Sequence, residues 1–200
     1  MELEVISEAP RAFIIENFLS EFEADEIIRT AEPMIRVSMV GDGDGGGARV
    51  DATRTSWNAW LKRNVNPVVN TLHLRAADLL KFDERIMYSH ANAEDLQVVH
   101  YVNGQKYDNH HDWGVSGYPE SRYITLLLYL TEPEKGGETA FPKGADGQGI
   151  KVIPKKGMAV LFYDLLEDGN GDELSLHAAL PVYKGEKWLA NFWVWDPQRK

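Results

Sequence analysis

The second half of the chain is dominated by short apolar runs of the kind that form β-strands. Four runs are rich in β-branched and aromatic residues and are separated by clusters of Gly, Pro and Asn. They are Leu96–Val102, Tyr123–Leu130, Met158–Tyr163 and Leu189–Trp195. Their composition predicts antiparallel strands, arranged as a sandwich or a barrel, from about residue 91 onwards.

The first half of the chain predicts helices. Ser20 and Glu23 form an S-x-x-E capping box, which is the signal of a helix N-terminus. The apolar residues that follow recur at helical spacing: Ala24, Ile27, Ile28, Ala31 and Ile35. A second helix is predicted to begin near Asn66, with Pro67 in its first turn. Helices first and strands afterwards indicate a single α+β domain over residues 1–200, with the helices packed against the strands.

The composition excludes several kinds of site. The chain has 200 residues, of which 44% are hydrophobic and 26% are charged, as expected of one soluble domain. It contains no cysteine, so disulfides, thiolate zinc sites and a cysteine nucleophile are excluded, and a metal must be held by His, Asp or Glu. The net charge of −10 disfavours nucleic acid as a partner, because such binding depends on Lys and Arg.

The ends and loops of the chain carry few signals. No run approaches the roughly 18 apolar residues of a membrane span. The segment Met1–Arg11 is acidic and lacks the apolar stretch of a signal peptide. We therefore expect a cytoplasmic protein with no membrane contact in this chain, unless a targeting segment has been removed; the sequence does not predict the oligomeric state. Two loops, Gly41–Gly47 and Trp113–Glu120, are expected to be lids.

One His-x-Asp triplet makes a metal site plausible in chemical terms. Non-haem iron oxygenases hold Fe(II) with two histidines and one carboxylate on one face. Residues i and i+2 of a strand share a face, so His110 and Asp112 point the same way while His111 points the other way. By itself this triplet is weak support, because about one His-x-acid triplet is expected by chance in this composition.

A third ligand must come from a distant strand, and His177 is the candidate. It lies in S-L-H-A-A-L-P-V-Y-K-G-E-K-W, which we interpret as a hairpin with its turn near Lys184 and Gly185. Lys187 begins the return strand, from which its ammonium would meet a carboxylate beside His177. His177 and Lys187 could each have an ordinary structural role instead. A lone histidine is more often packed in the core or exposed than bound to a metal, and this is our expectation for His73, His90 and His100.

Together these segments resemble the collagen-type prolyl 4-hydroxylases. The similarity is carried by Y-V-N-G-Q-K-Y-D-N-H-H-D, Y-I-T-L-L-L-Y-L, G-G-E-T-A-F-P and H-A-A-L-P-V-Y-K-G-E-K-W. The opening R-A-F-I-I-E-N-F-L-S and the R-T-S at residues 54–56 are similar to that family as well. The resemblance implies a double-stranded β-helix, or jelly roll, core flanked by N-terminal helices.

The resemblance also implies roles for particular residues. His110, Asp112 and His177 match the iron ligands. Lys187 matches the lysine that pairs with the far carboxylate of 2-oxoglutarate, and Tyr101 and Thr139 match two residues that hydrogen-bond the same group. The positions that line the peptide site correspond to Tyr107, Arg122 and Trp193. Catalytic roles are thereby implied for His110, Asp112, His177 and Lys187.

The implied activity is hydroxylation of proline at C4 in a peptide or protein, coupled to conversion of 2-oxoglutarate to succinate and CO₂. The expected cofactors are Fe(II), 2-oxoglutarate as cosubstrate, O₂ and L-ascorbate. The chain departs from the family where H-A-A-L-P replaces H-A-G-C-P after the distal histidine, so the substrate has alternatives. The alternatives are hydroxylation of another peptide residue or a small molecule, or a cupin-like binding module without turnover.

Overall fold

A computed structural model of the chain describes residues 2–41, 49–88, 91–114 and 122–196. The first strands in these residues are β1 (Glu4–Glu8), β2 (Arg11–Ile15), β3 (Arg36–Val37), β4 (Trp57–Leu61), β5 (Leu96–Tyr101), β6 (Tyr107–His110) and β7 (Arg122–Tyr129). They are followed by β8 (Lys135–Gly136), β9 (Thr139–Phe141), β10 (Ile150–Val152), β11 (Ala159–Tyr163), β12 (His177–Ala179), β13 (Val182–Lys184) and β14 (Lys187–Trp195).

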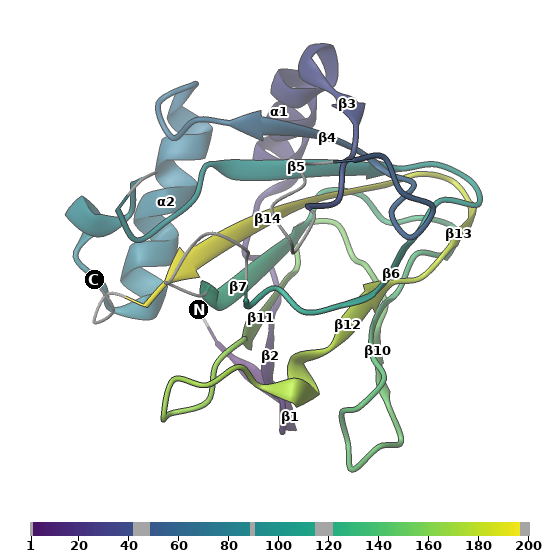
Figure 1. The fold of residues 1–200 in the computed structure, drawn as a ribbon. Coiled ribbons are helices and arrows are strands. Elements are labelled where there is room, and N and C mark those ends of the chain that lie inside the picture. The colour runs from purple at the N-terminus through teal and green to yellow at the C-terminus, as the bar shows by residue number, and fades with distance from the viewer. Residues whose placement is uncertain (1, 42–48, 89–90, 115–121, 197–200) are drawn as a thin grey trace.

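The strands form two principal antiparallel sheets (Figure 1). Within the described residues, the larger sheet has the order β1-β2-β11-β7-β14-β5-β4-β3, and the smaller has the order β10-β9-β12-β6. β13 and β8 form a separate pair. Side chains of both sheets share one apolar cluster, so the sheets pack face to face as in a jelly roll. This confirms the predicted fold class.

Two α-helices and three short 3₁₀ turns complete the described structure: α1 (Glu21–Ala31), α2 (Pro67–Leu80), η1 (Glu32–Met34), η2 (Glu84–Ile86) and η3 (Glu173–Ser175). The capping box of α1 is present, because the Ser20 hydroxyl accepts from the Glu23 amide and the Glu23 carboxylate accepts from the Ser20 amide. The prediction that this helix reaches Ile35 is wrong. Pro33 cannot continue an α-helical ladder, so the chain tightens into η1 and then turns away.

The larger sheet has two buried faces with different partners. One face packs against α1 and α2, through residues such as Leu126 and Phe192. The other faces the smaller sheet, through residues such as Leu127 and Leu189. Alternate residues of one strand therefore belong to different cores, as the two-residue period of a strand requires. Figure 1 shows the helices on the side of the larger sheet away from β6, β12 and β10.

The segment from His177 to Lys187 differs from the predicted hairpin. β12 belongs to the smaller sheet, β13 pairs with β8, and β14 belongs to the larger sheet, so these three strands do not pair with one another. Lys187 does begin β14, as predicted. The hairpin prediction failed because successive strands of a jelly roll alternate between sheets, and a turn signal at Gly185 does not distinguish a hairpin from a crossover.

Some expectations concern residues outside this description. The predicted lids at Gly41–Gly47 and Trp113–Glu120 lie mostly outside the described residues, and so does His90. Among the residues described, no helix is both long enough and apolar enough to cross a membrane.

Candidate metal centre

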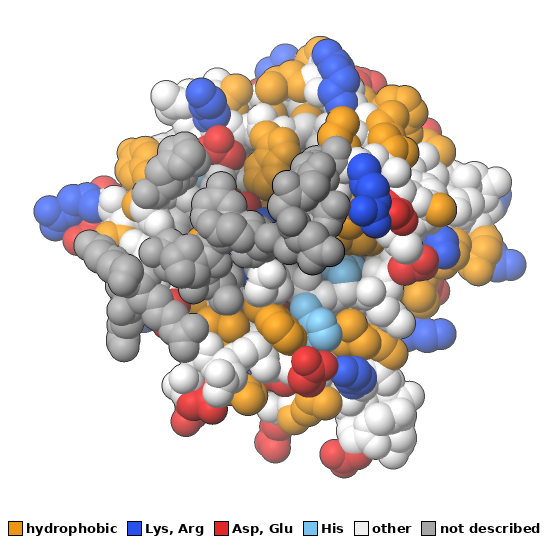
Figure 2. Space-filling model, viewed as in Figure 1, with side chains coloured by type: hydrophobic (Ala, Val, Ile, Leu, Met, Phe, Trp, Pro, Cys, Tyr) orange, Lys and Arg blue, Asp and Glu red, His pale blue; other side chains and the backbone are white. Residues whose placement is uncertain are grey.

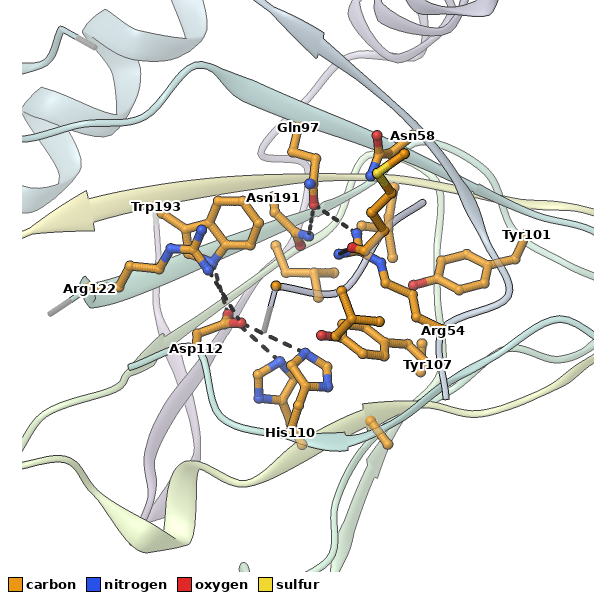
Figure 3. Close-up of a pocket in the computed structure, with 18 of the residues that line it drawn as sticks. Arg54, Asn58, Gln97, Tyr101, Tyr107, His110, Asp112, Arg122, Asn191 and Trp193 are labelled. Carbon is orange, nitrogen blue, oxygen red and sulfur yellow. Dashed lines mark hydrogen bonds and ion pairs between the residues drawn. The ribbon is translucent and has the colours of Figure 1, made fainter. Parts of the chain in front are cut away.

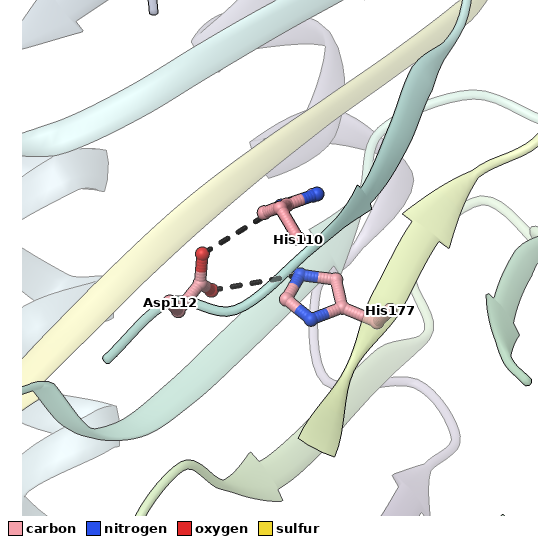
Figure 4. A group of neighbouring side chains, drawn as sticks. All are labelled: His110, Asp112 and His177. Atoms are coloured by element: carbon pink, nitrogen blue, oxygen red, sulfur yellow. Dashed lines mark ion pairs between the residues drawn. The ribbon is translucent and has the colours of Figure 1, made fainter. Parts of the chain in front are cut away.

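Three side chains meet at one end of the smaller sheet. His110 is the last residue of β6, Asp112 follows two residues later, and His177 is the first residue of β12. The pairing of β12 with β6 places His177 opposite His110. One ligand atom of each residue lies within 4.8 Å of the other two, close enough to share one metal ion. Figure 4 shows the three side chains converging.

Backbone carbonyls fix the orientation of both histidine rings. His110 Nδ1 lies 2.8 Å from the Asp108 carbonyl oxygen, and His177 Nδ1 lies 3.0 Å from the Ser175 carbonyl oxygen. A carbonyl can only accept, so each Nδ1 carries a hydrogen, and Nε2 is the ring nitrogen that offers a lone pair to a metal when the ring is neutral. Burial, with repulsion from His177, lowers the pKa of His110 to about 3, which keeps its ring neutral.

Asp112 is buried and is held from one side. Its Oδ2 lies 2.9 Å from Trp193 Nε1, which donates to it, and 2.8 Å from Thr125 Oγ1. Its Oδ1 lies 3.7 Å from His110 Nε2 and 3.9 Å from Arg122 Nη1. Burial raises the pKa of Asp112, but the two histidines, Arg122 and the Trp193 hydrogen bond outweigh burial and hold it below its ordinary value. The carboxylate is therefore ionised, with Oδ1 less engaged than Oδ2.

The remaining described histidines lie outside this group. His111 lines the same cavity, but its Nε2 approaches the Glu173 carbonyl oxygen at 3.3 Å and its ring packs on Trp113. His73 is buried against Phe192, and His100 stacks on Trp188. The expectation that these two histidines are packing residues is consistent with these contacts.

The three candidate ligands open onto a cavity of about 1020 Å³. Five further residues that the sequence singled out contribute to its lining: Tyr101, Tyr107, Arg122, Thr139 and Trp193. Histidine side chains are visible near the middle of this face of the molecule in Figure 2. The cavity is large enough for a small cosubstrate together with part of a peptide, since ligand sites range over roughly 300–1,000 Å³.

Lys187 is fully buried behind this lining. Its Nζ lies 5.7 Å from the centre of the Tyr101 ring and 5.5 Å from that of Tyr129, and no hydrogen-bond partner for it exists among the described residues. Burial lowers the pKa of Lys187 to about 7. Beside it, the Tyr129 hydroxyl donates to Thr139 Oγ1 at 2.8 Å, and burial raises the pKa of Tyr101 to about 12. A buried ammonium without an acceptor is costly, so this place suits an anion.

The wall of the cavity near Asp112 contains the rings of Trp193 and Tyr107 and the guanidinium of Arg122 (Figure 3). The Arg122 guanidinium lies 3.5 Å from the centre of the Trp193 ring, and its Nε and Nη2 donate to Glu94. The Tyr107 ring stacks on His110 with centres 3.6 Å apart. The structure thus brings together the three residues expected at a peptide site, but two of the Arg122 nitrogens and the Trp193 N–H already have protein partners.

The sequence analysis gave no role in the site to several polar residues of the cavity and its surroundings. The Arg54 guanidinium lies over Tyr107 and donates to Gln97 Oε1, which also accepts from Asn191. Thr125 and Tyr129 on β7 were missed in the same way. The signal was the strand period: Thr125, Leu127 and Tyr129 share the face of β7 opposite the helices, as Lys187, Asn191 and Trp193 do on β14.

Comparisons with known proteins agree with this geometry. The model of the 2OG-Fe(II) oxygenase superfamily matches residues 96–195. Prolyl 4-hydroxylase 2 of Arabidopsis thaliana is 36% identical over 210 residues, which cover 94% of this chain and 68% of that protein. Probable prolyl 4-hydroxylase 7 of the same plant is also 36% identical, over 94% of this chain and 64% of its own length.

Solved structures extend the similarity to three dimensions. The viral collagen prolyl hydroxylase of Paramecium Bursaria Chlorella virus-1, solved as its 2OG complex, is 29% identical with a TM-score of 0.71, over 92% of this chain and 95% of that one. A prolyl-4-hydroxylase of Pseudomonas putida, 21% identical with a TM-score of 0.62 over 92% and 91% of the two chains, shares the fold. The chain belongs to the 2OG-Fe(II) oxygenase superfamily, as a member of its prolyl 4-hydroxylase family, and is an Fe(II)- and 2-oxoglutarate-dependent dioxygenase.

Proposed function

We propose that this enzyme hydroxylates C4 of proline within peptides or proteins. The reaction consumes one 2-oxoglutarate and one O₂: one oxygen atom enters the proline, the other enters succinate, and the C1 carboxylate leaves as CO₂. The observation that carries the proposal is the pairing of two features around one cavity. A group of two histidines and one ionised carboxylate lies at one end, and the buried, unpartnered ammonium of Lys187 lies behind the wall.

The ligand group fits Fe(II). Two imidazole nitrogens and one carboxylate oxygen are the donor set of non-haem iron oxygenases. We assign the iron ligands as His110 Nε2, His177 Nε2 and Asp112 Oδ1, because the other polar atoms of these side chains already contact the protein. Bound Fe(II) supplies the activation of O₂ and the oxidation of the C–H bond, while the surrounding side chains orient the reactants and exclude water.

The environment of Lys187 fits the far carboxylate of 2-oxoglutarate. A carboxylate there would give the buried Nζ both an acceptor and a counter-charge, which removes the cost of an isolated cation. Tyr101 and Thr139 both line the cavity. Tyr101 lies opposite Lys187 in the pairing of β5 with β14, and Thr139, on β9 of the smaller sheet, accepts from Tyr129, whose ring lies beside Lys187. We therefore assign the hydroxyls of Tyr101 and Thr139 as further donors to that carboxylate. Among the described residues, Lys187 has no hydrogen bond to an iron ligand, so we assign it to the far carboxylate of the cosubstrate and not to the metal.

The peptide is assigned to the wall formed by Tyr107, Arg122 and Trp193. Polyproline II segments are preformed and dock on aromatic surfaces, and the open cavity presents both rings. Glu94 occupies Nε and Nη2 of Arg122, so Nη1 is the nitrogen assigned to a carbonyl of the peptide. A distantly related prolyl hydroxylase of Trichoplax adhaerens has been solved with a peptide fragment.

The test is a panel of proline-rich peptides incubated with Fe(II), 2-oxoglutarate and ascorbate, followed by mass spectrometry. The expected result is the gain of one oxygen atom on proline, with succinate formed in equal amount. Reactions without 2-oxoglutarate, and reactions of Asp112→Ala, serve as controls. Oxygen on free proline but on no peptide would contradict the substrate assignment. Oxygen on another residue of the peptides would contradict the proline assignment and leave the dioxygenase chemistry in place.

A further inference from the structure

A buried chain of oxygen atoms leads away from the assigned iron ligand into the larger sheet. Thr125 Oγ1, on β7, lies 2.8 Å from Asp112 Oδ2 and also 2.8 Å from Asp164 Oδ2. Asp164 follows β11 and is fully buried. Its backbone is fixed as well, since its amide donates to the Tyr123 carbonyl and its carbonyl accepts from the Asp172 amide. The three side chains are thus held in one line.

Counting hydrogens shows that this line contains an extra proton. A threonine hydroxyl has one hydrogen and can donate to only one of two carboxylates. If both aspartates were ionised, one of the two 2.8 Å contacts of Thr125 would bring lone pairs together without a hydrogen between them. Both contacts are hydrogen bonds only if one aspartate is protonated and donates to Thr125 while Thr125 donates to the other.

The surroundings decide which aspartate carries the proton. Asp112 faces two histidines, accepts from the Trp193 N–H and lies near Arg122, all of which favour its ionised form. Asp164 Oδ2 contacts Thr125, and Asp164 Oδ1 has no hydrogen-bond partner among the described residues. Burial, followed by repulsion from Asp112, raises the pKa of Asp164 well above its ordinary value. The proton therefore resides on Asp164 Oδ2.

We propose that Asp164 is a positioning residue whose neutral carboxyl group donates to Thr125, so that Thr125 donates to Asp112 and aims the iron-binding carboxylate. The proposal rests on the assignment of Asp112 as an iron ligand. In this arrangement Asp112 Oδ2 is engaged by two donors, Thr125 and Trp193, and Oδ1 is left for the metal. The register of the larger sheet builds this pair, because Trp193 lies directly opposite Thr125.

The proposal predicts a particular pattern of rescue. Thr125→Val keeps the volume but removes the hydroxyl, and Thr125→Ser restores it. Asp164→Leu removes the donor, whereas Asp164→Asn keeps a neutral group that donates through its amide. Loss of groups that orient a metal ligand typically lowers metal affinity roughly 10–100-fold. We expect that loss for Thr125→Val and Asp164→Leu, and a change of less than about threefold for Thr125→Ser and Asp164→Asn.

The measurement is anaerobic calorimetric titration of the full chain with Fe(II), together with the melting temperature of the metal-free protein. Ile27→Ala, a buried change in α1 away from the site, controls for stability alone and should leave Fe(II) affinity unchanged. If Asp164→Leu does not fold, the two Thr125 variants still decide the question. Unchanged affinity in Thr125→Val, or a loss in Asp164→Asn as large as in Asp164→Leu, would overturn the proposal.

A second readout is independent of iron. The infrared spectrum of the metal-free protein at neutral pH should contain the carbonyl stretch of a protonated carboxylic acid, and Asp164→Asn should remove it. A spectrum without that band in the unmodified protein would also overturn the proposal. If instead Asp112 is not an iron ligand, the result is distinguishable from failure of this proposal, because Asp112→Ala would then bind Fe(II) as tightly as the unmodified protein does.

Discussion

Two ends of the cavity differ in how far the protein satisfies its own polar groups: the iron end, which holds the three assigned ligands, and the lysine end, which lies at Lys187. At the iron end, both histidine Nδ1 atoms donate to carbonyls, and Asp112 Oδ2 accepts from its neighbours. At the other end, the Lys187 ammonium is buried without a hydrogen-bond partner among the described residues. We infer from this difference that the protein preorganises the iron end, whereas the lysine end is completed only when a ligand binds.

The largest effect is expected from breaking the iron end. Replacement of His110, Asp112 or His177 by Ala removes one of three ligands, and the remaining two cannot hold Fe(II) against exchange with solvent. Iron content after anaerobic loading and desalting should fall to background, and succinate release should fall with it. Retention of one iron per chain in any of the three variants would remove that residue from the site.

Breaking the lysine end should spare the metal. Charge-assisted hydrogen bonds contribute roughly 1.5–3 kcal/mol, so Lys187→Met should weaken 2-oxoglutarate binding roughly 10–150-fold. Fe(II) affinity should remain unchanged, because Lys187 contacts none of the three ligands.

The same variant makes an opposite prediction for stability. Lys187→Met removes a buried, unpaired ammonium, so the melting temperature of the ligand-free protein should rise while cosubstrate affinity falls. Lys187→Arg is the matched control, since it keeps the cation in another shape and should restore affinity only in part. A Lys187→Met protein with an unchanged Michaelis constant for 2-oxoglutarate would place the lysine outside the site.

A change of pH is expected to have a smaller effect on the affinity for 2-oxoglutarate, and the direction of this effect follows from the protonation of Lys187. Because burial lowers the pKa of free Lys187 to about 7, the lysine must take up a proton to bind a carboxylate at higher pH. The affinity for 2-oxoglutarate should therefore fall as pH rises, by about fivefold between pH 7 and 8. Lys187→Arg should abolish this dependence, because arginine stays protonated. An affinity that rises over this interval would contradict the assignment.

The features that could be predicted from the sequence are those determined by residues close together in the chain. The cap of α1 and the start of α2 follow from local signals at Ser20, Glu23 and Asn66. His110 and Asp112 could be paired because their spacing of two residues brings side chains to one side of a strand. The roles of His177 and Lys187 were predicted from motifs that resemble a family. In the structure His177 is the first residue of β12 and Lys187 is the first residue of β14.

What could not be predicted depends on register between strands far apart in the chain. Thr125 reaches Asp112 because β7 lies beside β14 and opposite β6, and nothing near Thr125 in the sequence indicates this. Asp164 looks like an ordinary turn residue after a strand until the pairing of β11 with β7 places it beside Thr125. A one-residue change of register would move either side chain to the helix-facing side of the sheet, where the described residues form an apolar cluster.

The smallest effect on Fe(II) affinity is expected from substitution of His111, which tests which residues belong to the iron end. His111 is the neighbour of His110 and lines the same cavity, so proximity alone would make it a ligand candidate. Its ring instead packs on Trp113, and its Nε2 approaches the Glu173 carbonyl oxygen, and the group that could hold a metal does not include it.

His111→Ala should therefore change Fe(II) affinity by less than about threefold, a shift of well under 1 kcal/mol. The substitution removes a partly exposed ring and no atom of the assigned coordination sphere, and the hydrogen bonds that orient His110 and Asp112 stay intact. Calorimetric titration of both His111→Ala and His110→Ala with Fe(II) makes the comparison direct, because the two substituted residues are neighbours in the chain. If His111→Ala lost iron while His110→Ala kept it, the register of β6 would be wrong by one residue, and the pairing of His110 with His177 would fail with it.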